Sequence, residues 1–454
     1  MHVIVIGGGI AGASAAFALA RRGAAVTVVD SGEAGQATAA SAGIIAPWAS
    51  SVQGPFYDLY AAGAAYYPEV IGLLAEAGVE RTDYRRNGEL LVHEDPARLD
   101  EAHALVQARA REAGGIVGEV RRIGNDEVRA LFPVLAGNLE GVFVSGGGRV
   151  DGRTMCDALL QGAVHHGARQ VRGRARLRPQ GSPAVEVGSG VLEADAVLVA
   201  SGAWANELLA PRGLRLAVEP QRGQISHLRL DGVDTSGWPS VHPLSHHYMV
   251  AFDDSRVAVG ATRETGSGFD ARVTARGQWQ VLSDALRIAP GLADATLIET
   301  RVGLRPLPSG QVPIAGPLPG EDGLHVVTGF GAAGLTMAPF TGDALARSIL
   351  DGTTVPELTP SCLEPGTPVP RLTGVLRLSL LLLASLTACS SGERPCTLMG
   401  SLEGVHVNVD QAVSARAERL AMEVCWDGTC RRSSGELMPP RGRASRPAPG
   451  TPAR

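Results

Sequence analysis

The feature that most constrains the fold is the glycine-rich turn Gly-Gly-Gly-Ile-Ala-Gly at residues 7–12. It follows a short apolar run at residues 2–6, which predicts a buried strand, and precedes an alanine-rich stretch, which predicts a helix. In such a turn Gly7 permits the tight bend, Gly9 lets the backbone approach a pyrophosphate, and Gly12 lets helix and strand pack closely. The helix N-terminus then presents free N–H groups to the phosphates.

A second apolar run, Val26 to Val29, ends on Asp30, which lies 18 residues after Gly12. A carboxylate at that place accepts hydrogen bonds from ribose hydroxyls. Together, the two strands, the turn, the helix and the acid predict a dinucleotide-binding domain of the doubly wound α/β type. The pattern alone does not distinguish FAD from NAD.

The glycine-rich pattern occurs again at residues 329–334, after a predicted strand at 324–328. We do not expect a second nucleotide there. Pro339 falls where a phosphate-binding helix should already be running, and Asp351 follows a predicted helix at 341–350 instead of a strand. This turn is expected to bring backbone N–H groups and a helix start to a flavin ring.

The residue pattern changes between residues 215 and 300. Segments such as 224–230 and 256–260 alternate in polarity, which predicts antiparallel strands with one solvated face. The fold class is therefore predicted as α/β plus a mixed sheet, with a Rossmann-like FAD-binding domain interleaved with an antiparallel-sheet substrate domain. The FAD-binding pieces are expected at about 1–88, 146–215 and 300–356, and the substrate pieces at about 89–145 and 216–299 of an oxidoreductase region 1–356.

Further motifs occur in a fixed order along residues 1–355. They are Val29–Gly32, Thr38–Ile45, Gly147–Arg153, Ala200–Trp204, Pro220–Gln224, Val259–Thr262, Gly303–Pro306 with Pro313 and Gly316, and Thr328-Gly329 with Gly334-Leu335 and Ala338-Pro339. In order and spacing the chain resembles the D-amino acid oxidase superfamily of flavoproteins, nearest in pattern to glycine oxidase and to the small-subunit-type D-amino acid dehydrogenases.

The resemblance implies FAD as the cofactor and assigns residues to its ADP half and isoalloxazine edge: Gly7, Gly8, Gly9, Ile10, Ala11, Gly12, Asp30, Ser31, Thr38, Ser41, Ala42, Gly43 and Ile44. It assigns the second glycine turn to the flavin pyrimidine, through Gly331, Ala332, Gly334, Leu335 and Thr336, with Gly202 as a further contact. Two alternatives stay open. Thr38 and Ser41 could only cap turns, and Gly202 could serve packing.

The resemblance also implies a carboxylate clamp. Arg305, in Gly-Leu-Arg-Pro, matches the arginine that binds the substrate carboxylate, and Tyr248 matches the tyrosine that adds a hydroxyl to it. A salt-bridged Arg305 and a core Tyr248 are the alternatives. Some glycine oxidases carry a second arginine where this chain has Ala332, so a clamp with one arginine is expected. His246 and His247 could line the entrance or lie on the surface.

The predicted activity is FAD-dependent oxidation of the C–N bond of a small amino acid, a D-amino acid or a glycine-like one. The imino acid product hydrolyses to an oxo acid and ammonia, and oxygen or an electron carrier accepts the electrons. An FAD-dependent 2-hydroxy acid dehydrogenase of the same superfamily is the alternative, followed by a lipid-anchored non-enzymatic protein. We expect no metal site and, at a net charge of -5, no nucleic-acid partner.

The last 100 residues differ in character. Pro-rich residues 357–370 predict a linker, and residues 371–389, with a short Leu-rich core ending at Cys389, resemble a bacterial lipoprotein signal. An amphipathic tail helix is the alternative. Residues 390–438 resemble a small lipoprotein domain in which Cys425 and Cys430 could form a disulfide if exported, and 439–454 are predicted disordered. The enzyme part is expected in the cytoplasm, with membrane contact only if Cys389 is lipidated.

Overall fold

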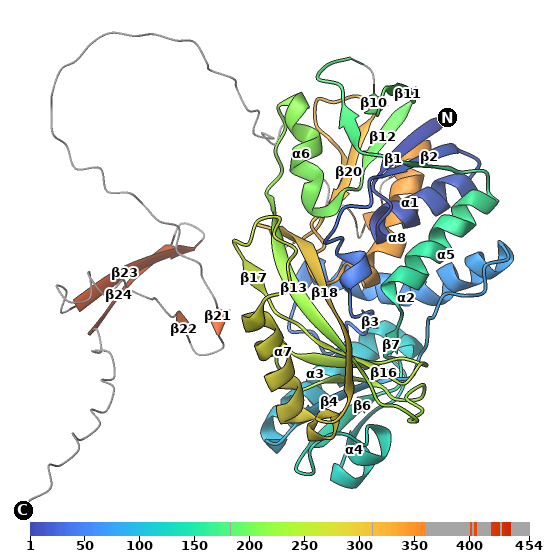
Figure 1. Ribbon diagram of the computed structural model, residues 1–454. Helices are drawn as coiled ribbons and strands as arrows, with labels where there is room; N and C mark the ends of the chain where they lie inside the picture. Colours follow the sequence, from blue (N-terminus) through green and yellow to red (C-terminus); the bar gives the residue numbers. More distant parts are fainter. Residues whose placement is uncertain are drawn as a thin grey trace, which may run out of the picture. The chain divides into compact units, whose positions relative to one another are not determined.

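The computed structural model describes residues 1–353 apart from Ser182 and Gln311, residues 355, 356 and 358, and the backbone of four short strands beyond residue 399 (Figure 1). The chain divides into two compact units, Met1–Val375 and Leu376–Arg454. The first unit contains two large sheets, and the elements that carry the predicted motifs belong to it.

A six-stranded sheet forms around the N-terminal strand. Its order is β19 (Ile314–Pro317), β20 (Leu324–Thr328), β12 (Ala196–Val199), β1 (His2–Ile6), β2 (Ala25–Asp30) and β8 (Arg169–Arg172), parallel except for β19. Both faces of the four inner strands, β20, β12, β1 and β2, are covered, which is why these strands are largely apolar, whereas the edge strand β8 is polar and mostly exposed.

Each face of this sheet packs against a different set of elements. One face contacts α1 (Ile10–Arg21), α5 (Gly152–His165) and α8 (Gly334–Asp351) (Figure 1). The other packs on α6 (Ala205–Leu209) and on the small sheet of β9 (Ala175–Leu177), β10 (Ala184–Val187) and β11 (Gly190–Glu193).

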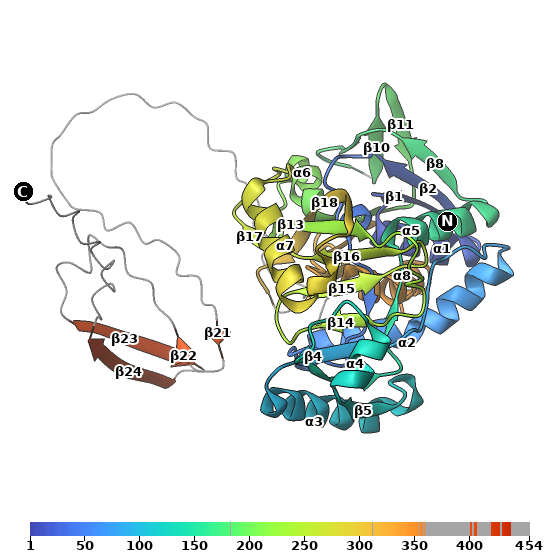
Figure 2. The ribbon, with the colours of Figure 1, turned by 60° about the horizontal axis from the view of Figure 1, so that its bottom comes forward.

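A nine-stranded mixed sheet forms the second layer of the unit, and Figure 2 shows β13, β16, β15, β14 and β4 side by side. Its order is β17 (Glu264–Thr265), β13 (Val218–Arg229), β16 (Arg256–Gly260), β15 (Tyr248–Ala251), β14 (Ser240–His242), β4 (Glu89–His93), β6 (Glu140–Val144) and β5 (Val120–Ile123), with β18 (Thr296–Pro308) paired along β13. The predicted fold class is confirmed, with one parallel pairing, β4 with β14, inside the otherwise antiparallel sheet.

The two faces of the nine-stranded sheet have different roles. One packs on α4 (Asn125–Leu131) and α7 (Ala275–Ile288) through Leu90, Val241 and Met249. Since side chains alternate along a strand, the intervening residues face the turn before the short strand β3 (Ile44–Ile45), and Tyr248 and Val250 pack there against Ala42. This second face carries the candidate site.

The remaining helices of the first unit are α2 (Gly54–Glu76) and α3 (Pro96–Ala113), and β7 (Gly148–Arg149) pairs with β3. Among the described residues, no helix is both long enough and apolar enough to cross a membrane.

Two predicted elements differ from the structure. The strand expected near 171–177 is two strands of different sheets, β8 and β9, because the chain leaves the first at Gly173. The helix expected at 341–350 begins already at Gly334 and contains Pro339.

Pro339 is accommodated because a side chain replaces the backbone group that proline lacks. Proline has no N–H to donate to the carbonyl four residues earlier, which here belongs to Leu335. The Tyr67 hydroxyl of α2 donates to that carbonyl at 2.6 Å. The helix therefore runs through Pro339, and the proline does not count against a second nucleotide at this turn, contrary to the expectation from the sequence.

In the second unit the structure describes β21 (Gly400–Ser401), β22 (Gly404–Val405), β23 (Arg419–Trp426) and β24 (Thr429–Glu436). Cys425 and Cys430 are register partners in the β23–β24 hairpin. The predicted linker 357–370, the lipoprotein-like segment 371–389 with Cys389, and the tail 439–454 lie outside the described residues, apart from residue 358.

Candidate active site

The turn between β1 and α1 has the backbone that its glycines predict. Gly7 has φ +109°, and a Cβ added there would lie 2.4 Å from the Ala200 carbonyl oxygen. A Cβ at Gly12 would lie 1.9 Å from the Gly7 carbonyl oxygen. The residue before α1, Gly9, has no side chain with which to cap the helix. Apart from the Ile10 N–H, which Thr38 accepts, no side-chain cap occupies the helix start among the described residues, and it can receive an anionic ligand.

Asp30 lies at the end of β2, directly beneath this turn. Its Oδ2 accepts the Gly8 N–H at 2.6 Å and its Oδ1 accepts the Gly32 N–H at 2.7 Å. Each carboxylate oxygen keeps a further lone pair, so Asp30 retains acceptors for ribose hydroxyls. Ser31 follows at the same strand end and is partly exposed.

Thr38 and Ser41 make the local hydrogen bonds that turn capping predicts. The Thr38 Oγ1 accepts the Ile10 N–H in the first turn of α1 at 3.0 Å. The Ser41 hydroxyl donates to the Thr38 carbonyl at 2.7 Å. These contacts hold the segment 38–41 beside the glycine turn, so that a capping role and a place at the nucleotide are compatible.

The second glycine turn joins the same site. The Thr336 hydroxyl, in the first turn of α8, donates to the Ile44 carbonyl at 3.0 Å. Gly43 and Gly331 have φ +86° and +53°, which favour glycine. The other predicted residues here are Ala42 and Leu335, which are buried, Gly334, which begins α8, and Ala332, which is exposed.

Gly202 lies at the start of a 3-10 helix, Gly202–Trp204, after β12. Its φ is +55°, and its carbonyl accepts the Thr328 hydroxyl at 2.9 Å. This bond links the ends of β12 and β20, and the positive φ, not a close neighbour, favours glycine here, since an added Cβ would meet nothing within 4 Å.

The residues fit a flavin dinucleotide. An open helix start, glycines whose Cβ atoms would strike backbone, and a carboxylate at the next strand end together form a cradle for a pyrophosphate and its ribose. The structure brings Gly7–Gly12, Asp30, the segment 38–44 and the turn 331–336 to this one region.

Arg305 and Tyr248 come together on the nine-stranded sheet. Arg305 lies on β18 opposite Gln221, and its guanidinium covers Gly223, where an added Cβ would come within 2.2 Å of it. Its Nη1 donates to the Thr262 carbonyl at 3.0 Å. Burial raises the pKa of Tyr248, while the Arg305 and Arg263 charges oppose that shift. Arg305 forms no ion pair with any described residue.

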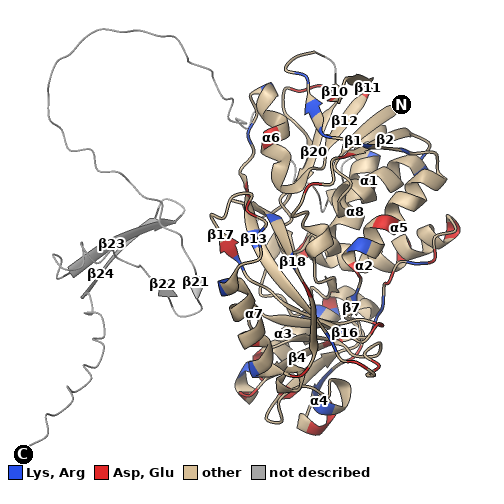
Figure 3. Ribbon diagram, in the orientation of Figure 1, with Lys and Arg blue, Asp and Glu red and all other residues tan. Residues whose placement is uncertain are grey.

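Sequence reasoning missed a second arginine, Arg263. Burial and the like charge of Arg305 lower its pKa, and Tyr248 opposes this. Arginines and acidic residues are interspersed along the first unit (Figure 3), and several form ion pairs, as where Arg222 pairs with Glu264 at 2.7 Å. Arg263 forms no such pair within the described residues. Its signal was its place directly after the Val259–Thr262 motif.

The two histidines before Tyr248 differ. His246 is exposed and lies near Arg263, whose charge lowers the pKa of His246. His247 is buried, and desolvation lowers its pKa to about 4. His246 therefore lies at the surface beside Arg263, and His247 lies in the interior.

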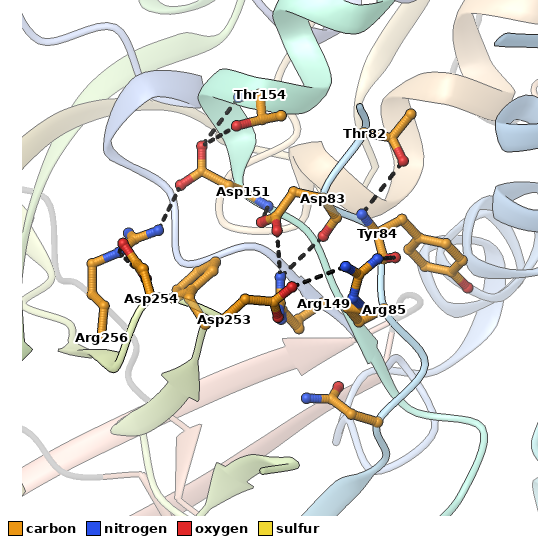
Figure 4. Close-up of polar contacts among 12 residues, drawn as sticks. Thr82, Asp83, Tyr84, Arg85, Arg149, Asp151, Thr154, Asp253, Asp254 and Arg256 are labelled. Atoms are coloured by element: carbon orange, nitrogen blue, oxygen red, sulfur yellow. Dashed lines mark hydrogen bonds and ion pairs between the residues drawn. The ribbon is translucent and has the colours of Figure 1, made fainter. Parts of the chain in front are cut away.

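A buried ion-pair network holds the two sheets in place beside the site (Figure 4). Arg149 of β7, fully buried, pairs with Asp83 at 2.8 Å and with Asp253 in the β15–β16 turn. Asp151 accepts N–H groups at the start of α5 and pairs with Arg256 of β16 at 3.3 Å. Burial raises the Asp151 pKa, but these hydrogen bonds and charges outweigh burial and lower it.

Comparison with known proteins agrees with this geometry. The family described as DAO, FAD dependent oxidoreductase, matches residues 2–348. An uncharacterized oxidoreductase of Bacillus subtilis (strain 168) is 44% identical over 361 residues, covering 79% of this chain and 97% of its own. Glycine oxidase of Pseudomonas aeruginosa is 31% identical over 76% of this chain and 93% of its own.

Solved structures extend the comparison. Iminodiacetate oxidase from Chelativorans sp. BNC1 is 48% identical with a TM-score of 0.76, over 79% of this chain and 98% of that one. Glycine oxidase from Geobacillus kaustophilus is 27% identical with a TM-score of 0.69, over 80% and 98%. With the nucleotide cradle in place and the family match spanning residues 2–348, the chain belongs to the DAO family of FAD-dependent oxidoreductases, and its cofactor is FAD.

Proposed function

We propose that this enzyme oxidises the C–N bond of a small amino acid that carries two carboxylates. The observation that supports this is the pairing of Arg305 and Arg263. Both guanidinium groups act on Tyr248, and neither forms an ion pair with a carboxylate of the described residues. Arg305 is half-buried and Arg263 is exposed, and their like charges repel each other. A ligand with two carboxylates relieves that repulsion, and each guanidinium can bind one carboxylate through two N–H groups.

The relatives support the same substrate class. The 48% identical structure is that of an iminodiacetate oxidase, and iminodiacetate is a secondary amine with a carboxylate on each side of its nitrogen. The relatives that are 31% and 27% identical are glycine oxidases, and glycine has one carboxylate. The clamp with one arginine, expected from the sequence, is therefore replaced in this proposal by a clamp with two.

In the proposed reaction the substrate Cα–H bond is cleaved and the amine becomes an imine. FAD, when bound, supplies the acceptor for the hydride. Arg305 and Tyr248 hold the carboxylate next to the reacting Cα, and Arg263 holds the second carboxylate. Hydrolysis of the imine yields an oxo acid and either ammonia or a second amino acid. Oxygen or an electron carrier then takes the electrons from the cofactor.

The test is an anaerobic titration of the yellow holoenzyme, followed through loss of the oxidised flavin band. The panel contains iminodiacetate, glycine, sarcosine, D-amino acids, proline and 2-hydroxy acids. We expect iminodiacetate to bleach the flavin at the lowest concentration. Bleaching by 2-hydroxy acids alone would establish the alternative, a 2-hydroxy acid dehydrogenase.

Variants separate the two arginines. Arg305→Leu should abolish reduction by every amine while FAD stays bound. Arg263→Met should lower the kcat/KM ratio of iminodiacetate to glycine by about 10- to 100-fold, as expected for one charge-assisted hydrogen-bonding contact. Arg98→Met, on the exposed start of α3, is the matched control and should leave the ratio unchanged. An unchanged ratio in Arg263→Met would refute the two-carboxylate assignment.

A further inference from the structure

A buried polar cluster lies on the site face of the nine-stranded sheet, and the proposed reaction has not used it. Glu89 of β4 and Ser240 of β14 are register partners, and His242 follows on the same face. Glu89 is 1% exposed, and its Oε1 lies 3.5 Å from the His242 Nε2. The Glu89 Oε2, the Ser240 Oγ and the His242 Nε2 are buried without a hydrogen-bond partner in the structure. Such atoms are rare in proteins unless they serve a function or hold water.

This cluster lies between the substrate clamp and the second glycine turn. The His242 ring is 6.4 Å from the Tyr248 ring, centroid to centroid, and the register places the two residues opposite each other. The His242 side chain keeps 24% of its surface exposed although its Nε2 is buried against Glu89. On the other side, Glu89 acts on Tyr60 of α2, whose hydroxyl interacts with Thr336.

The protonation states of Glu89, His242 and their neighbours are compatible with proton transfer between them. Burial raises the pKa of Glu89 to about 8. Burial and then His247 lower the pKa of His242 to about 4. The neighbouring Tyr60 is neutral because burial raises its pKa to about 12. Tyr248 and the Arg305 charge lie beyond His242. A carboxyl that ionises near pH 8 is poised to accept a proton from a substrate ammonium.

We propose that His242 and Glu89 form a proton relay that takes the ammonium proton of the bound substrate, an inference that rests on the proposed C–N oxidation. The substrate N–H bond breaks and an N–H bond forms at the His242 Nδ1, while the Nε2 proton moves to the Glu89 Oε1. The ammonium and the carboxylate lose their charges together. His242 is the catalytic residue, Glu89 acts through it, and the amine is left with the lone pair that oxidation requires.

The test is rapid mixing of anaerobic holoenzyme with iminodiacetate, following flavin bleaching from about pH 6 to about pH 10. The wild-type limiting rate should level off near the Glu89 pKa. In His242→Asn and Glu89→Gln it should instead keep rising about tenfold per pH unit, because only free amine reacts. His325→Asn, half-buried on β20 and outside the proposed site, is the matched control and should keep the wild-type profile.

Two measurements do not depend on turnover. Thiodiacetate has both carboxylates but no N–H, so its Kd should stay within about threefold of wild type in His242→Asn. A tenfold weaker Kd would mark a structural role and overturn the relay. The infrared difference between wild type and Glu89→Gln should contain a protonated carboxyl band at pH 6 that disappears above pH 8. Its absence at pH 6 would also overturn the relay.

The outcomes separate the relay from the reaction it serves. A wild-type pH profile in either His242→Asn or Glu89→Gln overturns the relay while C–N oxidation stands. Failure of wild-type holoenzyme to be reduced by any amine overturns the proposed function itself, whatever the variants do.

Discussion

Replacing Glu89 by glutamine should change how the stability of this protein depends on pH. The folded-state pKa of Glu89 is about 8, against an ordinary value of 4.5, because the carboxyl is buried. Below pH 4.5 both states are protonated. As the pH rises toward 8 the unfolded chain gives up its proton and the folded chain keeps it, so stability falls throughout that window and levels off above it. At ~1.4 kcal/mol per pH unit the whole loss is about 5 kcal/mol.

Glutamine has the same shape as glutamate and no charge, so the stability of Glu89→Gln should not fall with pH through this residue. We expect the free energy of unfolding of the variant, minus that of wild type, to grow by about 4 kcal/mol between about pH 5 and pH 9. Urea unfolding of matched holoenzymes, followed by circular dichroism, measures it. Repeating the comparison of Glu89→Gln with its parent in a His242→Asn background removes the electrostatic interaction between Glu89 and His242. A difference that stays within about 1 kcal/mol across the range would show that Glu89 ionises near its ordinary pKa and would refute the reasoning.

Two further pairs of variants and one single variant test the site and its supports. Gly12→Ala should lose FAD, measured as flavin content, because its Cβ would strike the Gly7 carbonyl. Gly72→Ala, which has open space around it on α2, should keep FAD and raise the free energy of unfolding by about 0.5–1 kcal/mol, measured through the melting temperature. Arg149→Met should lower the free energy of unfolding by about 3 kcal/mol, because it breaks a buried ion pair. Arg85→Met, which breaks an exposed ion pair, should lower it by less than about 1 kcal/mol, and thermal unfolding measures both. Tyr248→Phe should raise the substrate KM about tenfold with FAD retained; an unchanged KM would remove Tyr248 from the clamp.

Much of the nucleotide site could be predicted because its chemistry is local. The turn at residues 7–12 needs glycines at set positions between a strand and a helix, and Asp30 follows at the end of the next strand. The helix in the second glycine turn was placed too late, because the Tyr67 hydroxyl that accommodates Pro339 comes from α2, more than 200 residues earlier in the chain.

The substrate side was less predictable. Arg305 and Tyr248 were found through motifs that resemble a family, and the structure brings them together. Arg263 is one of many arginines in a chain without lysine, and nothing in the sequence near it distinguishes a free guanidinium from one in a salt bridge such as that of Arg222. Only the tertiary arrangement determines which arginines have acidic partners.

By itself the sequence determined the α/β class and the dinucleotide turn, because glycine geometry and strand periodicity act between residues close in the chain, while FAD was expected only from the resemblance to a family. The tertiary structure decided which side chains share the site: β4, β14, β15 and β18 bring Glu89, His242, Tyr248 and Arg305 to one sheet face. The physical reason is that burial and charge pairing depend on neighbours from distant segments, and these set the pKa of Glu89 and leave Arg263 and Arg305 unpaired among the described residues.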